Sequence, residues 1–371
     1  MSAPTSTQGS STASPTSGDT TASVSATASD ETSPETSTSS DSSDSSDSEG
    51  SSSDGRPPAT FHNPLNESHG SDPWMLYHEG EYYLAATTWG TTLSMKHGAT
   101  IAELQAAEPE VLWDGELDAP SRCCNMWAPE FHLLDGPNGL RWYMYYTAGD
   151  GNDLGTQRSH VLESEGTDPM GPYHFAGTLY PGMWAIDGSI LEHDEQRYFL
   201  FSSGWGGLQS VLIAPMSNPW TISGERVPIT TPTLPWEQEG DFPVNEGPEP
   251  LIHDGRTFVV FSASHCASPG YKLGLAELTG SDPLDPGDWT TYPDPVFEQV
   301  DGVYGPAHNG FFMSPDGTEN WIVYHANDDP GAGCWVWRTS RIQPFGWSDA
   351  GLPDFGAPLP LSSELVVPSG E

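Results

Sequence analysis

The sequence predicts an all-β protein, a five-bladed β-propeller with a disordered N-terminal tail. Two observations predict the propeller: five segments share one pattern, and the pattern recurs at intervals of about 60 residues, the length of a four-stranded blade. A third predicts the tail, because every Trp, Tyr and Phe lies beyond Arg56 and the residues before it are almost all small or polar. We therefore divide the chain into a disordered Ser/Thr/Asp-rich tail, residues 1–56, and a propeller domain, residues 57–371.

Each of the five segments contains a short polar motif, an apolar run, a turn and then an aromatic-rich strand. The turn sequences HEGE, DGPNG, HDEQ, HDGR and PDGT have the composition of β-hairpins. The runs beside them are rich in Tyr, Phe, Val and Leu and lack helical periodicity. The segments, one for each blade, begin at Ser71, Trp127, Ile186, Asn245 and Ala307.

The residue that heads the innermost strand of each blade should face the propeller axis, because near-fivefold rotation brings equivalent positions together. These heads are Asp72, Trp127 with Glu130, Asp187, Glu246 and His308. Asp-Pro and Glu-Gly-Pro are ordinary turn sequences when they occur singly. At blade spacing, however, they gather carboxylates at one point, which is costly unless chemistry uses them. The sequence thus predicts a central pocket with Asp72, Asp187 and Glu246 as its catalytic candidates.

In this order and spacing, the motifs SDPW, WAPE, IDGS, NEGP and PAHNG resemble the inverting glycosidases of glycoside hydrolase family 43. The closing segments RTSRIQPFGW and LPDFGAP resemble the α-L-arabinofuranosidase-like branches of that family. The resemblance extends over essentially all of residues 60–367. It implies that Asp72 is the general base, that Asp187 sets the pKa and orientation of the acid, and that Glu246 is the general acid.

The resemblance also implies roles for residues around the carboxylates. His308 corresponds to an axial histidine that often holds calcium or another cation through water, and Arg338 to an arginine that contacts the substrate. We further expect Trp127, Trp89 and Ile186 to bind substrate, although either tryptophan could instead belong to the core, His308 could be structural and Arg338 could form a structural ion pair. No cofactor is expected for the chemistry, and a cation on the axis would be structural.

Inversion needs one protonated carboxyl group and one ionised carboxylate, roughly 6.5–9.5 Å apart on opposite faces of the sugar. Carboxylates on the first and fourth blades can span a pocket in this way. A third carboxylate beside the acid can raise its pKa by like charge. The expected function is removal of terminal α-L-arabinofuranosyl residues from arabinan- or arabinoxylan-type carbohydrates. The alternatives are a β-xylosidase or endo-arabinanase of the same family, or a non-catalytic sugar-binding propeller.

The charge of the chain indicates its environment and excludes some partners. Of 52 acidic residues only nine precede Arg56, so the remainder carries 43 acids against 11 bases, a net charge of −32. Molar salt shortens the Debye length to about 3 Å and screens such repulsion, so this composition is typical of halophilic proteins. Nucleic acid is an improbable partner for it. No membrane-spanning segment or signal peptide is visible, and the Ser/Thr/Asp tract favours an extracellular protein.

The four cysteines, Cys123, Cys124, Cys266 and Cys334, match neither a disulfide scaffold nor a CxxC signature, and we expect them to be structural with their pairing left open. The adjacent pair departs from the family pattern just before Trp127. It could reshape the rim of the pocket beside the second blade.

Overall fold

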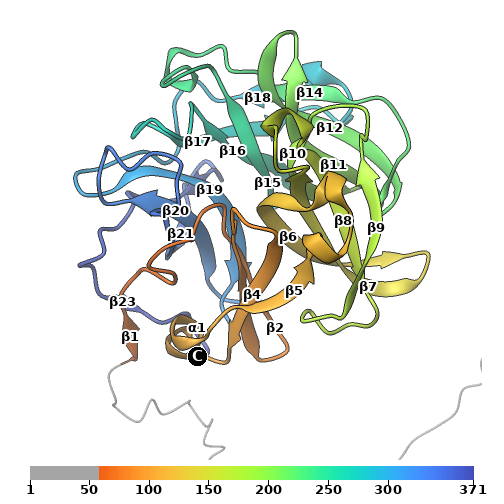
Figure 1. Ribbon diagram of the computed structural model, residues 1–371. Helices are drawn as coiled ribbons and strands as arrows, with labels where there is room; N and C mark the ends of the chain where they lie inside the picture. The colour runs from red at the N-terminus through yellow and green to blue at the C-terminus, as the bar shows by residue number, and fades with distance from the viewer. Residues whose placement is uncertain (1–57) are drawn as a thin grey trace, which may run out of the picture. The chain divides into compact units, whose positions relative to one another are not determined.

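The computed structural model describes residues 58–371, which form five antiparallel sheets around a common centre, together with a two-stranded closing sheet (Figure 1). The five innermost strands, β2, β6, β10, β15 and β19, contact one another in a closed ring. The predicted five-bladed β-propeller is therefore confirmed. The predicted tail, residues 1–56, lies outside the described residues.

Each sheet corresponds to one sequence segment. Blade one contains β2 (Trp74–His78), β3 (Glu81–Ala85), β4 (Thr92–Gly98) and β5 (Glu110–Asp114). Blade two contains β6 (Cys124–Gly136), β7 (Gly139–Gly149), β8 (Arg158–Ser164) and β9 (Tyr173–Leu179). Blade three contains β10 (Ile186–His193), β11 (Gln196–Trp205), β12 (Leu208–Asn218) and β13 (Thr221–Ile222), with β14 (Val227–Thr230) also paired to β12.

The remaining two blades follow the same order. Blade four contains β15 (Asn245–His253), β16 (Arg256–Ala263), β17 (Lys272–Leu278) and β18 (Trp289–Thr291). Blade five contains β19 (Tyr304–Met313), β20 (Asn320–Asn327), β21 (Thr339–Trp347) and β22 (Pro353–Asp354). One short helix, α1 (Ile101–Ala106), packs Ile101 and Leu104 beside blade one. The Thr100 side chain caps it by accepting a hydrogen bond from the Glu103 N–H.

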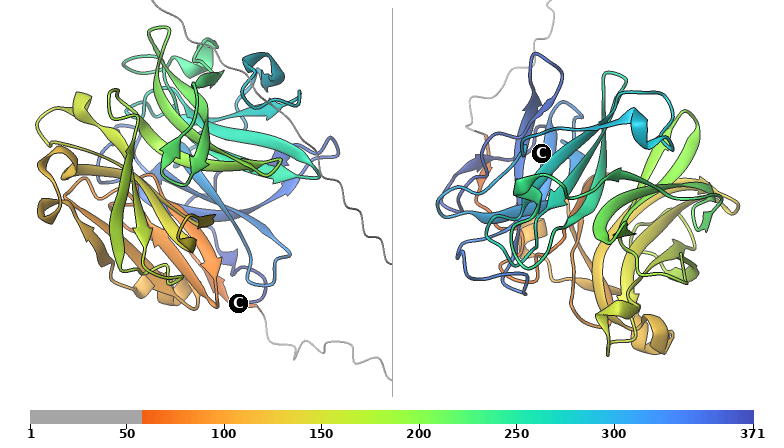
Figure 2. Two further views of the ribbon diagram at one scale, coloured as in Figure 1. Left: turned by 90° about the vertical axis from the view of Figure 1, so that its right-hand side faces the viewer. Right: turned by 90° about the horizontal axis from the view of Figure 1, so that it is seen from above.

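Figure 2 shows the blades in two further views. Apolar clusters fill the spaces between neighbouring blades and hold the ring together. In β7, Trp142, Met144 and Tyr146 pack towards blade one, whereas Tyr143 and Tyr145 pack towards blade three. Alternate side chains of a strand point to opposite faces of the sheet, and here both faces are buried. The middle strands consequently have continuous apolar sequences rather than an alternation of apolar and polar residues.

Three of the predicted hairpin sequences form two-residue turns in which both central residues are left-handed. Their central pairs, Glu79-Gly80, Asp194-Glu195 and Asp254-Gly255, all have positive φ angles. Two consecutive positive φ angles define the turn whose twist matches that of the flanking strands. These turns fix the pairing of β2 with β3, β10 with β11 and β15 with β16.

Both ends of the described chain take part in closing the ring. Strand β1 (Thr60–Phe61) pairs antiparallel with β23 (Leu365–Val366) (Figure 1). The segment after β1 then follows blade five, where the Gly70 N–H donates to the carbonyl of Arg338 at 2.9 Å. A Cβ atom on Gly70 would lie 2.3 Å from the backbone nitrogen of Ser340, so only glycine permits this approach. The ring closure thereby holds the segment that leads directly into Asp72.

Both lysines of the chain are buried. Lys96 Nζ donates to the carbonyl of Leu65 at 3.1 Å, and Lys272 Nζ pairs with Glu239 at 2.9 Å. The surface of residues 58–371 therefore presents many carboxylates and no exposed lysine. The excess of exposed carboxylates agrees with the negative net charge of the sequence.

Raising NaCl from about 0.1 M to about 3 M should raise the melting temperature by roughly 10 °C or more, because salt screens repulsion among surface carboxylates. The measurement is a thermal melt followed by circular dichroism. Sucrose at equal osmolarity is the control, since it favours compact states without screening charge. A midpoint that stays constant in NaCl, or rises equally in sucrose, would contradict the electrostatic explanation.

Candidate active site

The propeller encloses a cavity of about 470 Å³, and every residue that the sequence analysis assigned to the site lines it. These residues are Asp72, Asp187, Glu246, Trp127, Trp89, Ile186, Arg338 and His308. They come from all five blades and are brought together only by closure of the ring.

A repeated backbone feature turns the heads of the innermost strands towards the cavity. Asp72, Asp187 and His308 have φ angles of 52°, 55° and 47°, and the corresponding residues Ala128 and Gly247 have 43° and 52°. In blades two to five, the pairing register shifts at this point, as expected for a β-bulge. Left-handed backbone at non-glycine residues costs free energy and is concentrated at functional sites.

The second and fourth blades depart from the predicted equivalence of the heads, because Trp127 and Glu246 each precede the left-handed position of their strand. Glu246 precedes the left-handed position, which Gly247 occupies, so Glu246 corresponds to Ile186 and Trp127 rather than to Asp187. A Cβ atom on Gly247 would lie 3.1 Å from Nδ1 of His308, and this close contact explains the glycine. Blade spacing in the sequence cannot distinguish two adjacent residues, because the bulge changes which of them faces the axis.

Asp72 is buried in a network of donors. Its Oδ1 lies 3.1 Å from Nη1 of Arg338 and 3.3 Å from Nδ1 of His308, and the Thr87 hydroxyl donates to Oδ2 at 2.6 Å. Burial alone would raise the pKa of Asp72, but Arg338 and the two neighbouring histidines, His308 and His325, outweigh it and hold the pKa below its ordinary value. Asp72 is therefore ionised and can accept a proton.

Glu246 has the opposite protonation tendency. Its pKa is raised to about 7, chiefly by desolvation; the negative charge of Asp72 contributes to the rise, and the hydrogen bond from Tyr271 opposes it. The Tyr271 hydroxyl donates to Oε1 at 2.9 Å, and Gln209 Nε2 donates to Oε2 at 2.6 Å. A carboxyl group with this pKa is partly protonated near neutral pH and can donate a proton to a leaving oxygen.

Asp187 is joined to the strand that carries Glu246. Its Oδ2 accepts a hydrogen bond from the Gly247 N–H at 3.1 Å. Burial raises the pKa of Asp187 well above its ordinary value, and the charges of Glu246 and Asp72 raise it further. Two neighbouring carboxyl groups that both resist ionisation titrate as a pair. Desolvation and the charge of Asp72 raise the pKa of Glu246, and the like-charge interaction between Asp187 and Glu246 adds to the raised pKa of the pair.

Aromatic side chains form one wall of the cavity. The ring of Trp89 lies 5.3 Å from that of Trp127 and 5.8 Å from that of Trp335, measured between centroids. Among residues 58–371, the buried indole N–H groups of Trp89 and Trp127 have no hydrogen-bond partner. The indole rings themselves line the cavity and can pack against sugar C–H groups.

Sequence reasoning missed several residues that contact this site. His325 accepts a hydrogen bond from the Asp72 N–H at 3.0 Å through Nδ1. Its one signal in the sequence is a polar residue within the apolar strand VYHAN. Thr87, Gln209 and Tyr271 lie outside the innermost strands and carry no motif. They reach the carboxylates only through tertiary structure.

Further acidic side chains are buried on the innermost strands β6 and β15. Glu130 and Glu249 are both buried, and Glu249 accepts a hydrogen bond from Ser189 at 3.1 Å. Asn309 is buried as well, and its amide has no hydrogen-bond partner within residues 58–371. Donor atoms of His308 and these carboxylates do not converge closely enough for direct three-ligand coordination in the part of the chain that the structure describes. Their charge and polarity fit a cation held through water.

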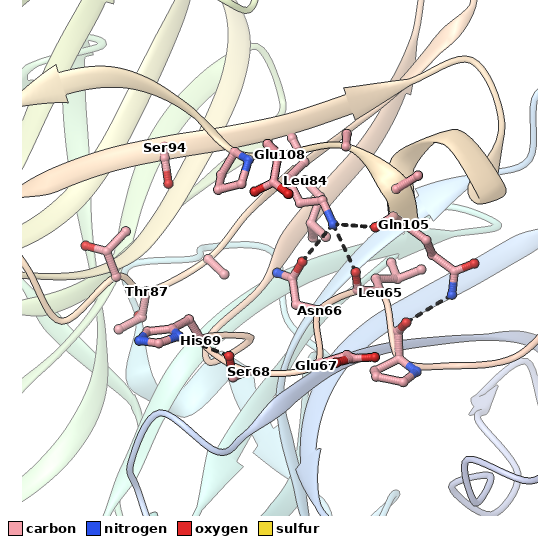
Figure 3. A pocket seen from close by; sticks show the side chains of 17 residues that line it. Leu65, Asn66, Glu67, Ser68, His69, Leu84, Thr87, Ser94, Gln105 and Glu108 are labelled. Atoms are coloured by element: carbon pink, nitrogen blue, oxygen red, sulfur yellow. Dashed lines mark hydrogen bonds between the residues drawn. The ribbon is translucent and has the colours of Figure 1, made fainter.

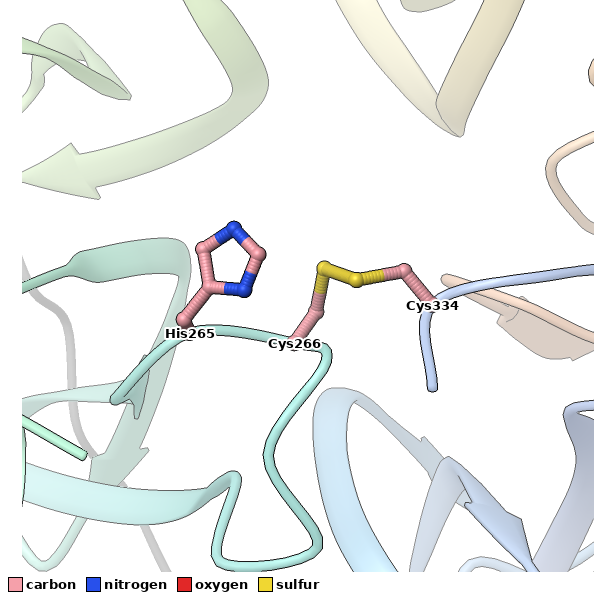
Figure 4. A group of neighbouring side chains, drawn as sticks. All are labelled: His265, Cys266 and Cys334. Carbon is pink, nitrogen blue, oxygen red and sulfur yellow. A yellow bond between two sulfur atoms is a disulfide. The ribbon is translucent and has the colours of Figure 1, made fainter. Parts of the chain in front are cut away.

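The described residues contain one group of three close metal-binding side chains, His265, Cys266 and Cys334 (Figure 4). The two sulfurs form a disulfide, so this group offers no thiolate to a metal. Cys123 and Cys124 form the other disulfide. The sequence left the pairing of the four cysteines open, and the structure resolves it.

A second cavity, of about 760 Å³, lies between residues 64–69 and blade one (Figure 3). Lys96 crosses its wall, donating to the carbonyls of Leu65 and Gln105 at 3.1 Å and to Oδ1 of Asn66 at 3.2 Å. None of the predicted site residues lines this cavity. Its polar contacts join the ring-closing segment to blade one.

Sequence comparisons identify a family and related proteins for this chain. The family model described as "Glycosyl hydrolases family 43" matches residues 61–353. The extracellular exo-α-(1→5)-L-arabinofuranosidase of Streptomyces avermitilis is 33% identical over 324 residues, covering 82% of this chain and 64% of the relative. α-L-Arabinofuranosidase 43 of Humicola insolens is 32% identical, covering 78% and 62%. The chain thus spans less than two thirds of these two relatives.

A solved structure is similar over nearly its whole length. The α-L-arabinofuranosidase from Lactobacillus brevis superimposes with a TM-score of 0.75 at 28% identity, covering 82% of this chain and 98% of that one.

Proposed function

The chain belongs to the glycosyl hydrolases of family 43, and from this membership we propose that it removes terminal α-L-arabinofuranosyl residues from arabinan- or arabinoxylan-type carbohydrates by inversion. The observation that carries the proposal is the meeting, in one aromatic-walled cavity, of an ionised Asp72 and a Glu246 with a pKa of about 7. The names of the related arabinofuranosidases favour the pentose.

In the proposed reaction, a water molecule attacks the anomeric carbon through its oxygen, and Asp72 accepts a proton from this water molecule. The glycosidic C–O bond breaks, and Glu246 gives its proton to the departing oxygen. Asp187 orients the strand of the acid through its hydrogen bond with Gly247. Arg338 keeps Asp72 ionised and, with Trp89, Trp127 and Ile186, positions the sugar.

The substrate is tested with para-nitrophenyl α-L-arabinofuranoside, para-nitrophenyl β-D-xyloside, linear arabinan and arabinoxylan, assayed in molar salt. We expect release of L-arabinose and little activity on the xyloside. Preferred xyloside cleavage would indicate a β-xylosidase, and internal cleavage of arabinan an endo-arabinanase. Sugar binding without turnover would indicate a non-catalytic propeller.

We further propose a structural cation held through water by His308 and Glu130. Its charge would offset the buried carboxylates around the axis. Chelation with EDTA should lower the melting temperature by roughly 2–4 °C, and calcium should restore it. The control is EDTA already saturated with calcium. An unchanged melt, together with no metal detected by mass spectrometry in the purified protein, would reject the cation.

An extracellular location is also proposed. The described residues contain two disulfides, which persist in oxidising compartments, and the Streptomyces avermitilis relative is named extracellular. No helix within residues 58–371 has both the length and the apolar character needed to cross a bilayer. Recovery of the protein only inside cells after fractionation would reject the proposal.

A further inference from the structure

Two exposed tryptophans lie on the loop of residues 328–338, between β20 and β21. Trp335 is 64% exposed and Trp337 is 67% exposed. Trp335 lines the catalytic cavity and lies against Trp89, whereas Trp337 is outside the cavity lining. Large exposed aromatic surfaces are characteristic of binding sites.

A disulfide fixes this loop at the mouth of the cavity. Cys334, the residue before Trp335, is bonded to Cys266 on the loop that follows β16 (Figure 4). Phe242, which also lines the cavity, is 48% exposed and lies 4.6 Å from the ring of His265, the neighbour of Cys266. Covalent anchoring reduces the conformational entropy that an aromatic side chain would lose on binding a ligand.

The anchored loop is also connected to the catalytic base. Arg338 Nη2 donates to the carbonyl of Cys334 at 2.8 Å, while Nη1 of the same side chain lies 3.1 Å from Asp72 Oδ1. Trp335 thus lies nearer the mouth of the cavity than the carboxylates do. A cavity of about 470 Å³ holds few sugar units, so the rest of a polymer must extend through the mouth.

We propose that Trp335, held by the Cys266–Cys334 disulfide, binds the pentose unit that follows the scissile bond in linear arabino-oligosaccharides. The aromatic ring packs against the C–H face of that unit. This inference rests on the proposed function. It assigns to Trp335 the binding of the part of the substrate that remains after the terminal residue has been released. Trp335 is therefore a determinant of specificity for oligosaccharides.

Replacement of Trp335 by Ala should raise KM for linear α-1,5-linked arabinotriose about tenfold, with a much smaller fall in kcat. The inhibition constant of free L-arabinose, which occupies only the inner pocket, should stay within about twofold. Trp335→Phe keeps an aromatic face and should recover most of the loss. Trp337→Ala is the matched control, with similar exposure on the same loop, and should leave KM within about twofold.

The role of the disulfide is tested by a double-mutant cycle. Cys266→Ser/Cys334→Ser should raise KM for arabinotriose several-fold, but by less than about twofold in a Trp335→Ala background, because both changes remove the same contact. Cys123→Ser/Cys124→Ser is the control pair and should have equal effects in the two backgrounds.

The outcomes separate this inference from the proposed function. If the wild-type protein leaves arabinotriose intact, the proposed function fails and the assignment of Trp335 fails with it. If the wild-type protein cleaves arabinotriose while Trp335→Ala and Trp337→Ala give equal KM values, the assignment of Trp335 alone is overturned. An effect of Trp335→Ala confined to kcat would also overturn it.

Discussion

Asp72→Ala should lower kcat at least about 10²-fold on aryl arabinofuranosides and on arabino-oligosaccharides alike, measured by initial rates in molar salt. The loss is equal because activation of water is needed whichever group departs. Asp72 suits this task because Arg338 and the Thr87 hydroxyl stabilise its ionised form. No other carboxylate that lines the cavity combines a lowered pKa with such a set of donors.

Two further variants guard against a purely structural explanation. Asp72→Ala leaves the guanidinium of Arg338 buried without its partner, which can cost several kcal/mol of stability, so Asp72→Asn should be measured beside it. Asp72→Asn keeps the volume and most hydrogen bonds, and it should lose comparable activity while melting near the wild-type temperature. Asp241→Ala, at the exposed mouth of the same cavity, should keep kcat within about threefold. If Asp241→Ala loses as much activity as Asp72→Asn, Asp72 is not the base.

The repeat made much of the fold and the core of the site predictable. The sequence pattern recurs at regular intervals, so five similar segments implied five blades. The polar residue at the head of each innermost strand implied a central pocket. His308 and Asp187 were found in this way. Glu246 also lines the cavity, but it precedes the left-handed position of its strand, which Gly247 occupies, and blade spacing does not encode this difference of one residue.

The residues that tune the carboxylates could not be found from sequence. Tyr271 precedes β17 and Gln209 lies in β12, and both meet Glu246 only after the blades assemble. The Cys266–Cys334 disulfide joins loops separated by 68 residues, and its pairing depends on how blades four and five are placed. Such contacts are non-local, whereas motifs and periodicity describe local sequence.

Glu246→Ala should lower kcat on arabino-oligosaccharides about 10²- to 10⁴-fold, and the loss on para-nitrophenyl α-L-arabinofuranoside should be at least about tenfold smaller. A sugar hydroxyl is a poor leaving group that needs the proton of Glu246, whereas nitrophenolate can depart without one. The comparison with Asp72→Ala is the control, because loss of the base should not depend on the leaving group. Product anomers read by NMR at early times should be inverted.

The pH profile tests the same assignment independently. Because Glu246 must be protonated to act and its pKa is raised to about 7, kcat/KM on oligosaccharides should fall as pH rises through about 7. Tyr271→Phe removes a hydrogen bond that stabilises the ionised form, so the pKa should rise and the alkaline limb should move to higher pH. The aryl glycoside should show a weaker alkaline limb in both proteins. Retained anomeric configuration, or equal losses on both substrates for the Glu246 and Asp72 variants, would contradict the assignment of Glu246 as the acid.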